Sequence, residues 1–266
     1  MKEEQRRALI TRASSGIGAA TARLLASEGY RVALLARRGD ELERVRASLA
    51  RGDQHLALVC DVRDGAAVRA ALKRVGEQFG ALDLLVNNAG VGCRARLEES
   101  DDSLVREVFA TNVVGLLSAS REALPLLRKG ARPVVVNISS ILGRRGVPGQ
   151  AVYSASKAAV CSLGEALRIE WAGDSIAVCT LEPGLTKTAI FDVQPNPSQL
   201  PNPSMAAADS AEDVARAILA LDRDPRPEVS LRGKWRWLGV LSVLAPRLAD
   251  KLLVRNMGGG WQVPRR

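Results

Sequence analysis

The sequence predicts an α/β fold built on a doubly wound parallel sheet. Short runs rich in apolar and β-branched residues alternate with longer stretches of helical pattern along most of the chain. Strands that are separated by helices pair in parallel through right-handed crossovers. A chain of 266 residues, of which 47% are hydrophobic, is long enough to bury the core of one such domain.

Seven strands and six helices are expected in order along the chain. The strands are expected at residues 8–11, 31–36, 56–60, 82–87, 133–139, 176–181 and, with a weaker pattern, 228–231. The helices are expected near residues 17–28, 39–50, 64–79, 101–129, 150–172 and 210–222. Segment 188–208 contains four prolines and is expected to be a long irregular loop, of the kind that often covers a binding site.

The positive charge is concentrated near the C-terminus. Residues 232–266 contain eight basic residues and one acid, which gives this segment +7 of the total +9 and leaves +2 for residues 1–231. Trp and Leu recur there at three- and four-residue steps, interrupted at Pro246. We therefore expect an α/β domain in 1–231 and a basic amphipathic extension in 232–266. The extension is expected to pack on the domain, and the pattern also leaves open peripheral contact with a membrane interface.

Several other classes of protein are not expected. No run of about 18 uncharged apolar residues is present, so no transmembrane helix is predicted. The charged N-terminus does not resemble a signal peptide. One histidine and four widely spaced cysteines predict neither a metal site nor a disulfide framework. Because the basic residues gather in the tail, nucleic-acid binding is not expected, and a cytoplasmic location is the simplest expectation.

A glycine-rich turn follows the first expected strand. Its sequence is Thr11-Arg12-Ala13-Ser14-Ser15-Gly16-Ile17-Gly18. Small residues at such a turn let a phosphate approach backbone N–H groups and the positive end of the next helix. A tight turn alone would need the same residues, but the position after the first strand of a βαβ unit favours a dinucleotide site.

The end of the second expected strand indicates which dinucleotide is bound. An NAD site places Asp or Glu there, to bond the ribose 2′-hydroxyl. Here the strand ends in Ala36 and is followed by Arg37 and Arg38, with no acid. Because guanidinium groups match phosphate geometry, the pair favours the 2′-phosphate of NADP(H). The alternative is a solvated charge pair that opens the next helix.

Tyr153 and Lys157 are the candidate catalytic pair. They are four residues apart in an expected helix, so both side chains lie on one helix face. A nearby ammonium is expected to lower the pKa of a phenol and so to suit it to general acid–base chemistry. Ser140 precedes the tyrosine by thirteen residues.

Taken together, these motifs resemble the short-chain dehydrogenase/reductase family, in its single-domain branch with a Rossmann-type fold. The resemblance covers about residues 6–232. It rests on the glycine-rich turn and on Asp61-Val62, Asn87-Asn88-Ala89-Gly90, Asn112, Asn137-Ile138-Ser139-Ser140, Tyr153-Ser-Ala-Ser-Lys157 and Pro183-Gly184. It implies homodimers or homotetramers built through the helices that carry Asn112 and Tyr153.

The resemblance also implies individual roles. Tyr153 is expected to exchange the proton, Ser140 to bond the substrate oxygen, Lys157 to lower the tyrosine pKa and hold the nicotinamide ribose, and Asn112 to anchor a water. The expected cofactor contacts are Thr11, Arg12, Ser14, Ser15, Gly16, Ile17, Gly18, Arg37, Arg38, Asp61, Val62, Asn88, Ala89, Gly90, Tyr153, Lys157, Pro183, Gly184, Leu185 and Thr188. The implied activity interconverts a carbonyl and a secondary alcohol of a small lipophilic molecule with NADP(H), preferring NADPH over NADH.

One residue departs from the family pattern. The motif begins Thr-Gly, whereas this chain has Thr11-Arg12. If the position requires a positive φ, a side chain costs about 1–3 kcal/mol there, and the guanidinium would also weaken or alter cofactor binding. Alternatively, it adds a third cation near a 2′-phosphate. A catalytically impaired nucleotide-binding or interaction protein, recruited through its basic tail, is therefore the second functional hypothesis.

The substrate pocket is expected beside the catalytic residues, between segments 91–96, 141–150 and 185–208. Apolar residues in these segments predict a lipophilic cavity. Arg94, Arg96, Arg144 and Arg145 are expected mainly as solvated loop charges, with contact to an acidic substrate as the alternative.

Overall fold

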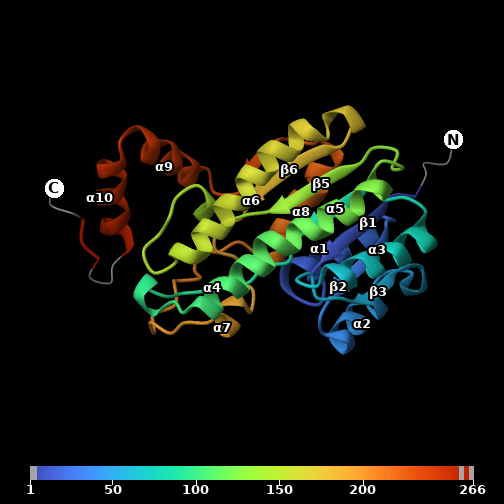
Figure 1. Cartoon of the computed structure of the whole chain (residues 1–266), viewed down its shortest axis with the longest axis horizontal. Coiled ribbons are helices and arrows are strands. Elements are labelled where there is room, and N and C mark those ends of the chain that lie inside the picture. Colours follow the sequence, from blue (N-terminus) through green and yellow to red (C-terminus); the bar gives the residue numbers. More distant parts are fainter. Residues whose placement is uncertain (1–4, 258–260, 264–266) are drawn as a thin grey trace.

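The computed structural model describes residues 5–257 and 261–263, apart from the side chains of Asp192 and of residues 234–236, so Trp235 of the predicted stripe lies outside the described residues. The centre of the molecule is a seven-stranded sheet in which every pairing is parallel (Figure 1). The strands are β1 Arg7–Thr11, β2 Arg31–Ala36, β3 Leu56–Val59, β4 Leu84–Asn87, β5 Val134–Ile138, β6 Ala177–Glu182 and β7 Glu228–Ser230. The predicted fold class is confirmed.

Helices cover both faces of the sheet. They are α1 Gly16–Ser27, α2 Gly39–Ala47, α3 Gly65–Phe79, α4 Asp102–Phe109, α5 Gly115–Leu127, α6 Ala151–Glu170 and α8 Ala211–Arg223. Side chains alternate across a strand, so Ala8 and Ile10 belong to one core with α1, α2 and α8. Leu9 belongs to the other core, with α3, α5 and α6. The near-continuous apolar sequence of the strands reflects this burial on two faces.

The strand order is β3-β2-β1-β4-β5-β6-β7, so the direction of winding reverses between β1 and β4. Both strands run into loops at the same edge of the sheet because they are parallel. The crevice outside the carboxyl ends at such a reversal is the usual ligand site of doubly wound sheets. It lies between the turn after β1 and the segment after β4.

The helix predicted for residues 101–129 has a more detailed structure than expected. It consists of α4 and α5 joined by one π-helical turn, Ala110–Val114. Such single π turns inserted between α-helical segments often occur at functional sites. Asn112 is buried in this turn.

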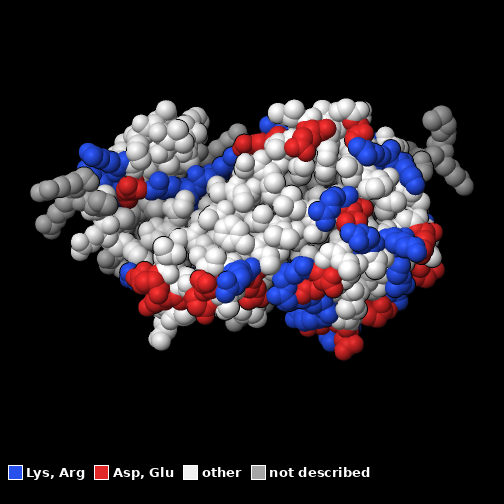
Figure 2. Space-filling view, in the orientation of Figure 1, with Lys and Arg blue, Asp and Glu red and all other residues white. Residues whose placement is uncertain are grey.

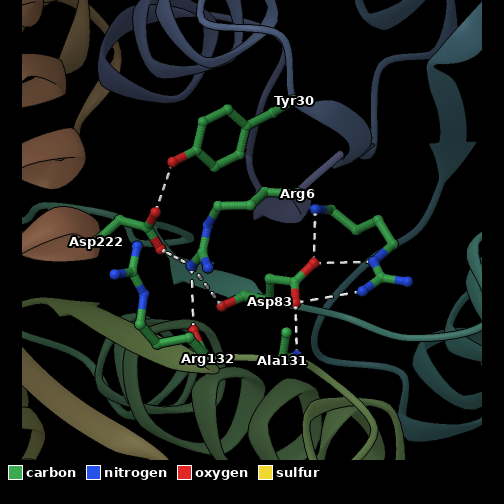
Figure 3. A network of polar contacts seen from close by, with 7 residues as sticks. Arg6, Tyr30, Asp83, Ala131, Arg132 and Asp222 are labelled. Atoms are coloured by element: carbon green, nitrogen blue, oxygen red, sulfur yellow. Dashed lines mark hydrogen bonds and ion pairs between the residues drawn. The ribbon is translucent and has the colours of Figure 1, made fainter. Parts of the chain in front are cut away.

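A buried polar network ties together the amino ends of the strands, at the edge of the sheet opposite the crevice (Figure 3). Asp222 of α8 accepts hydrogen bonds from Arg6 (2.5 Å) and from the hydroxyl of Tyr30 (2.6 Å). Asp83 accepts from the backbone N–H of Arg7 (2.9 Å) and from its Nε (2.8 Å). The network therefore cross-links β1 to α8 and to the start of β4.

The charge of Asp83 is stabilised by these bonds. Burial raises the pKa of this carboxyl, but hydrogen bonds from Arg7 and from the Ala131 amide lower the pKa by more, so the pKa lies below its ordinary range. Breaking a buried pair of this kind leaves an uncompensated charge. The network is therefore a contributor to stability rather than to ligand binding.

The C-terminal segment forms two helices at one end of the molecule, α9 Gly233–Leu244 and α10 Pro246–Met257 (Figure 1). The interruption predicted at Pro246 is the junction between them. The segment contacts the domain through Leu253, which lines a cavity with residues of the domain, and through Asp250, which pairs with Arg145. The two helices also pack on each other. None of the helices in the described ranges has the length and apolar character needed to cross a bilayer.

Candidate active site

Two cavities open at the carboxyl ends of the strands. The Arg37 cavity, about 630 Å³, lies beside Arg37 and Asp61. The Tyr153 cavity, about 570 Å³, lies beside Tyr153 and Ser140. Eight residues line both of them: Arg12, Ile17, Asn88, Gly90, Gly92, Thr188, Ile190 and Gln194. The two cavities are therefore halves of one groove.

Ser140, Tyr153 and Lys157 meet in the Tyr153 cavity, as predicted from their spacing. Ser140 follows β5, and the other two residues are one turn apart in α6. The Lys157 ammonium lies 5.9 Å from the centre of the Tyr153 ring and donates a hydrogen bond to the Ile138 carbonyl (2.9 Å). This bond fixes the lysine at the floor of the cavity.

Burial is the main cause of the pKa shifts of Tyr153 and Lys157. Burial raises the pKa of Tyr153 to about 12, although a side-chain hydrogen bond with Ser140 and the charge of Arg12 lower it. Burial and the charge of Arg12 lower the pKa of Lys157 to about 8. The expectation that the ammonium makes this phenol more acidic than usual is therefore wrong for the structure without ligands, because loss of hydration outweighs the nearby charges.

The two adjacent serines have different roles. The Ser139 hydroxyl donates to the Lys157 carbonyl (2.8 Å) and so ties β5 to α6. The Ser140 hydroxyl accepts from the Leu142 amide (3.2 Å) and lies close enough to Tyr153 to lower the pKa of its phenol. Ser140 is thus the serine placed beside the tyrosine hydroxyl, as the spacing predicted.

The π-helical turn places the predicted Asn112 behind Gly90, where it is buried and lines neither cavity. Its Oδ1 accepts from the Val91 amide (2.8 Å), and its Nδ2 donates to the Val91 carbonyl (3.0 Å) and to the Ser156 hydroxyl (2.9 Å). The side chain therefore fastens the segment after β4 to α6. Ser156, which the sequence analysis did not single out, completes this link.

The backbone of the glycine-rich turn requires both of its glycines. Gly16 has φ of +53°, which favours glycine. A Cβ atom on Gly18 would lie 2.4 Å from the Arg12 carbonyl oxygen, so only glycine fits there. Of the predicted contacts in this turn, Ser14, Ser15, Gly16 and Ile17 line the Arg37 cavity.

Thr11 and Gly18 are not among the residues that line either cavity. Thr11 is buried, and its hydroxyl accepts hydrogen bonds from the amides of Asn88 (2.9 Å) and Ala89 (2.8 Å). Thr11 and Gly18 therefore have structural roles. Thr11 joins the turn to the segment after β4, and Gly18 allows α1 to approach the turn closely.

Arg12 adopts a left-handed conformation with φ of +52°. Its Nη1 donates a hydrogen bond to the Gly90 carbonyl (2.6 Å), and its side chain lines both cavities. Burial is the main reason that the pKa of this guanidinium is lowered. The residue that departs from the family pattern therefore places a cation at the junction of the two halves of the groove.

The Arg37 cavity contains the predicted cationic pair and no acid at the end of β2. Ala36, Arg37 and Arg38 all line it. Arg38 is exposed and pairs with Glu41 (2.7 Å), whereas Asp61, which follows the neighbouring strand β3, pairs with Arg63 (2.6 Å). The rest of the predicted contacts are found as follows: Val62 and Ala89 line the Arg37 cavity, Pro183, Gly184 and Leu185 line the Tyr153 cavity, and Asn88, Gly90 and Thr188 line both.

Arg94 is not the solvated loop charge that was expected. It is 8% exposed, and its guanidinium donates to the carbonyls of Leu200 (3.1 Å) and Pro201 and to Oδ1 of Asn202 (2.9 Å). These acceptors belong to the proline-rich loop over the Tyr153 cavity. Arg94 therefore fastens this loop, the lid (residues 188–208), to the segment after β4.

Arg144 also differs from expectation. It pairs with Glu182 (2.5 Å), Glu228 (2.8 Å) and Glu165 (3.2 Å), which come from three separate elements. Such a set of partners, distant in sequence, is not visible in local patterns. Arg144 lines neither cavity and therefore forms no anion site there.

The C-terminal extension forms part of the Tyr153 cavity. Leu253, Asn256 and Met257 of α10, together with Trp261, line it. The Arg96 guanidinium lies 4.3 Å from the centre of the Trp261 ring, which holds this side chain over the mouth of the cavity. No cluster of His, Cys, Asp and Glu suited to a metal ion occurs within the described part of the chain.

Comparisons with known proteins agree with this geometry. Residues 6–197 match the family profile described as short chain dehydrogenase. An uncharacterized oxidoreductase of Mycobacterium tuberculosis strain H37Rv is 35% identical over 251 residues, covering 91% of this chain and 95% of that protein.

Solved structures of complexes with nicotinamide cofactors are similar as well. A 3-ketoacyl-(acyl-carrier-protein) reductase from Brucella melitensis, complexed with NADH, has a TM-score of 0.77 and 29% identity, covering 86% of this chain and 97% of that one. An alcohol dehydrogenase from the archaeon Thermococcus sibiricus, complexed with 5-hydroxy-NADP, has a TM-score of 0.77, 30% identity and the same coverage. With the matched profile, the parallel sheet and the Ser140–Tyr153–Lys157 cavity, the chain belongs to the short-chain dehydrogenase family of oxidoreductases.

Proposed function

We propose that this protein is an NADP(H)-dependent oxidoreductase that interconverts a carbonyl and a secondary alcohol on a small lipophilic substrate. The observation that carries the proposal is the meeting of Ser140, Tyr153 and Lys157 in a cavity continuous with a groove along the glycine-rich turn. An acid–base group beside a dinucleotide-sized groove is the arrangement that hydride transfer needs.

A nicotinamide dinucleotide suits the residues of this groove. The turn at Gly16 and the amino end of α1 offer backbone N–H groups and a positive helix end to a phosphate. A dinucleotide that spans both cavities must pass its diphosphate through their junction, where Arg12 supplies a cation. Asp61, Val62 and Ala89 would contact the adenine half, and Pro183 to Thr188 the nicotinamide half.

The preference for NADPH over NADH rests on the residues at the end of β2. A ribose 2′-phosphate in the Arg37 cavity would meet Arg37 and Arg38, and no carboxylate replaces Ala36 at the end of β2. Glu41 is a further wall residue of this cavity, but Arg38 neutralises it at 2.7 Å. Three cations (Arg12, Arg37 and Arg38) and three acids (Glu41, Asp61 and Glu107) line the cavity. The preference therefore rests on the position of Arg37 at the end of β2, where a guanidinium can bind a phosphate, rather than on an excess of positive charge.

The catalytic roles follow from the positions of the side chains. When bound, the nicotinamide supplies or accepts the hydride. Tyr153 holds the proton that the substrate oxygen gains in reduction and loses in oxidation, and its pKa of about 12 keeps that proton in place at neutral pH. Ser140 orients the substrate oxygen beside the phenol. Lys157, whose pKa is about 8, can pass a proton near neutral pH, and Asn112 holds the surrounding backbone.

The walls of the Tyr153 cavity support a lipophilic substrate. Ile141, Leu142 and Val147 follow β5, Ile190 and Phe191 belong to the short helix α7 (Ile190–Val193) of the lid, and Leu253 belongs to α10. Arg94 and Arg144, the cations considered for an acidic substrate, are committed to protein acceptors. An uncharged carbonyl compound therefore fits the cavity better than an acid.

The test of the proposal is Tyr153→Phe, which removes the titrating hydroxyl and keeps the ring. Turnover of a panel of ketones and aldehydes should fall below detection, while the dissociation constant of NADPH should change little. Tyr30→Phe is the matched control, because it removes the other tyrosine hydroxyl of the chain, which lies at the opposite edge of the sheet. Turnover retained in Tyr153→Phe on any accepted carbonyl would refute the mechanism. Lys157→Ala should reduce both turnover and NADPH affinity.

The second hypothesis, a nucleotide-binding or interaction protein with impaired catalysis, is favoured by one observation. The Arg12 guanidinium lies inside the groove, close enough to Tyr153 and Lys157 to affect the pKa of each. If NADPH binds and no member of the carbonyl panel is turned over by the unchanged protein, this hypothesis replaces the first.

We also propose that residues 1–231 form the catalytic domain, that 232–266 complete its substrate cavity, and that the chain forms a homodimer or homotetramer. The helices that carry Asn112 and Tyr153 would form the contact. Val114 (50% exposed), Leu117 (37%) and Ile169 (76%) lie on these helices as exposed apolar side chains. Ile169→Glu should then lower the molecular mass measured by light scattering.

A further inference from the structure

Helix α9 and the start of α10 carry an apolar surface that no other described residue covers. Its members are Trp237, Val240, Val243, Leu244 and Leu248, with exposed fractions from 45% for Val240 to 82% for Val243. Scattered single apolar residues are normal on a protein surface. Five large ones between residues 237 and 248 form a patch of the kind that marks an interaction site.

Unpaired cations border this patch. Arg247, Lys251 and Arg255 follow each other at four-residue intervals on one face of α10, and all three are exposed. No ion pair involves them among the described residues. Asp250 is the one acid of segment 232–266, and it is bound to Arg145. Figure 2 shows the surface over α9 as an uncharged bulge with lysine and arginine side chains beside it.

The patch is held in a fixed orientation. The other side of the two helices contacts the domain through the ion pair of Asp250 with Arg145 and through Leu253, which lines the Tyr153 cavity. Gly239 lies so close to the domain that an added Cβ would be 3.1 Å from the Cβ of Arg144. The exposed face is therefore presented outward by an anchored element, on the side away from the Tyr153 cavity that Leu253 lines.

We propose that this face docks the protein on the surface of an anionic lipid bilayer. Aliphatic side chains and a tryptophan enter the boundary between headgroups and acyl chains, and flanking cations meet the lipid phosphates. The charges argue against a second copy of the chain as the occupant. Two such faces in contact would bring Arg247, Lys251 and Arg255 of both copies together, and the one acid of segment 232–266, Asp250, is already paired with Arg145.

The first test is co-sedimentation with vesicles of phosphatidylcholine alone and of phosphatidylcholine mixed with phosphatidylglycerol. The full-length protein should bind the mixed vesicles at low salt, bind the neutral ones weakly, and be released by added salt. Val243→Glu combined with Leu244→Glu should weaken binding at least about tenfold, since two exposed anchors become anions. Leu97→Glu, which changes an exposed leucine outside the patch (68% exposed), is the matched control and should bind as the unchanged protein does.

The second test isolates the charge. Each basic residue near an anionic surface contributes about fivefold to binding, so Arg247→Gln, Lys251→Gln and Arg255→Gln together should weaken it roughly 100-fold. Arg69→Gln, Lys73→Gln and Arg74→Gln remove three exposed cations from α3 and should have no such effect. Melting temperatures within a few degrees of the unchanged protein establish that each variant is folded.

Two results would overturn the proposal. One is the absence of binding to the mixed vesicles at low salt by the unchanged protein. The other is unchanged vesicle binding by the variant that combines Val243→Glu and Leu244→Glu. If the unchanged protein binds no vesicles and the same double variant dissociates an oligomer, the face contacts a second copy of the chain. Because the readout is binding, it is independent of whether the protein turns over a carbonyl.

Discussion

Replacing Arg12 by glycine separates its effect on folding from its effect on the cofactor. A side chain at a positive φ such as the 52° of Arg12 costs about 1–3 kcal/mol. Glycine removes that cost but adds about 0.5–1 kcal/mol of backbone entropy on folding. The hydrogen bond to Gly90 is lost, while the desolvation of the guanidinium is relieved. The net gain in free energy of unfolding should be about 1 kcal/mol, or a rise in Tm of about 2–4 °C.

Cofactor affinity should change in the opposite direction. A cation about 5 Å from a diphosphate contributes up to about 3 kcal/mol at an effective dielectric constant of about 20. Two effects reduce this contribution of Arg12 to cofactor binding to about 1–2 kcal/mol. Salt screens the attraction, and a guanidinium that binds the diphosphate gives up its hydrogen bond with Gly90. The dissociation constant of NADPH, measured by the change in cofactor fluorescence, should therefore rise about 5- to 30-fold in Arg12→Gly.

Arg51→Gly is the matched control. Arg51 also has a positive φ, 59°, but lies in the turn after α2 and lines neither cavity. Both variants should gain stability, and only Arg12→Gly should lose cofactor affinity. Equal or tighter NADPH binding in Arg12→Gly would refute the reasoning, and would show that the guanidinium obstructs the groove.

Three further predictions concern other parts of the molecule. Arg37→Ala should weaken NADPH binding about tenfold and NADH binding much less, because a charged hydrogen bond is worth about 1.5–3 kcal/mol; equal losses for both cofactors would remove the 2′-phosphate assignment. Arg94→Met should free the lid, raising KM roughly tenfold with a smaller change in kcat and speeding proteolysis of residues 195–202, and an unchanged cleavage rate would contradict this role. Asp83→Asn should lower the free energy of unfolding at pH 7 by about 3 kcal/mol. Because the folded pKa of Asp83 is depressed, its stabilisation is complete above the unfolded pKa of about 3.9 and is lost as pH falls through the folded pKa. In urea titrations, the difference in free energy of unfolding between Asp83→Asn and the unchanged protein should thus become smaller below about pH 4. A difference that does not change with pH would show that the charge of Asp83 is not the source of the stabilisation.

The parts of the structure that the sequence predicted are those encoded locally. Strand–helix alternation and the position of the glycine-rich turn were enough to predict the parallel sheet. The four-residue spacing of Tyr153 and Lys157 predicted their common helix face, and the thirteen-residue spacing identified Ser140 rather than Ser139. Each of these inferences depends on short-range periodicity or on a motif of fixed length.

The parts that the sequence did not predict depend on contacts between distant segments. Arg94 and Arg144 are loop cations by local pattern, but their acceptors lie 38 or more residues away in most cases. The sign of the pKa shift of Tyr153 also could not be predicted, since it depends on how deeply the completed fold buries the ring. The π-helical turn at Asn112 leaves no mark in hydrophobic periodicity.

The two halves of the groove are drawn from different parts of the chain. The Arg37 cavity is lined by residues 12–111 and by a few residues of the lid, whereas most of the Tyr153 cavity wall comes from residues 138–261. Leu253, Asn256, Met257 and Trp261 of the C-terminal segment belong to the wall of the Tyr153 cavity. The two halves share residues of the glycine-rich turn, the segment after β4 and the lid, but no residue of the C-terminal segment lines the Arg37 cavity. A different C-terminal segment would therefore change the wall of the Tyr153 cavity and leave the residues that line the Arg37 cavity in place.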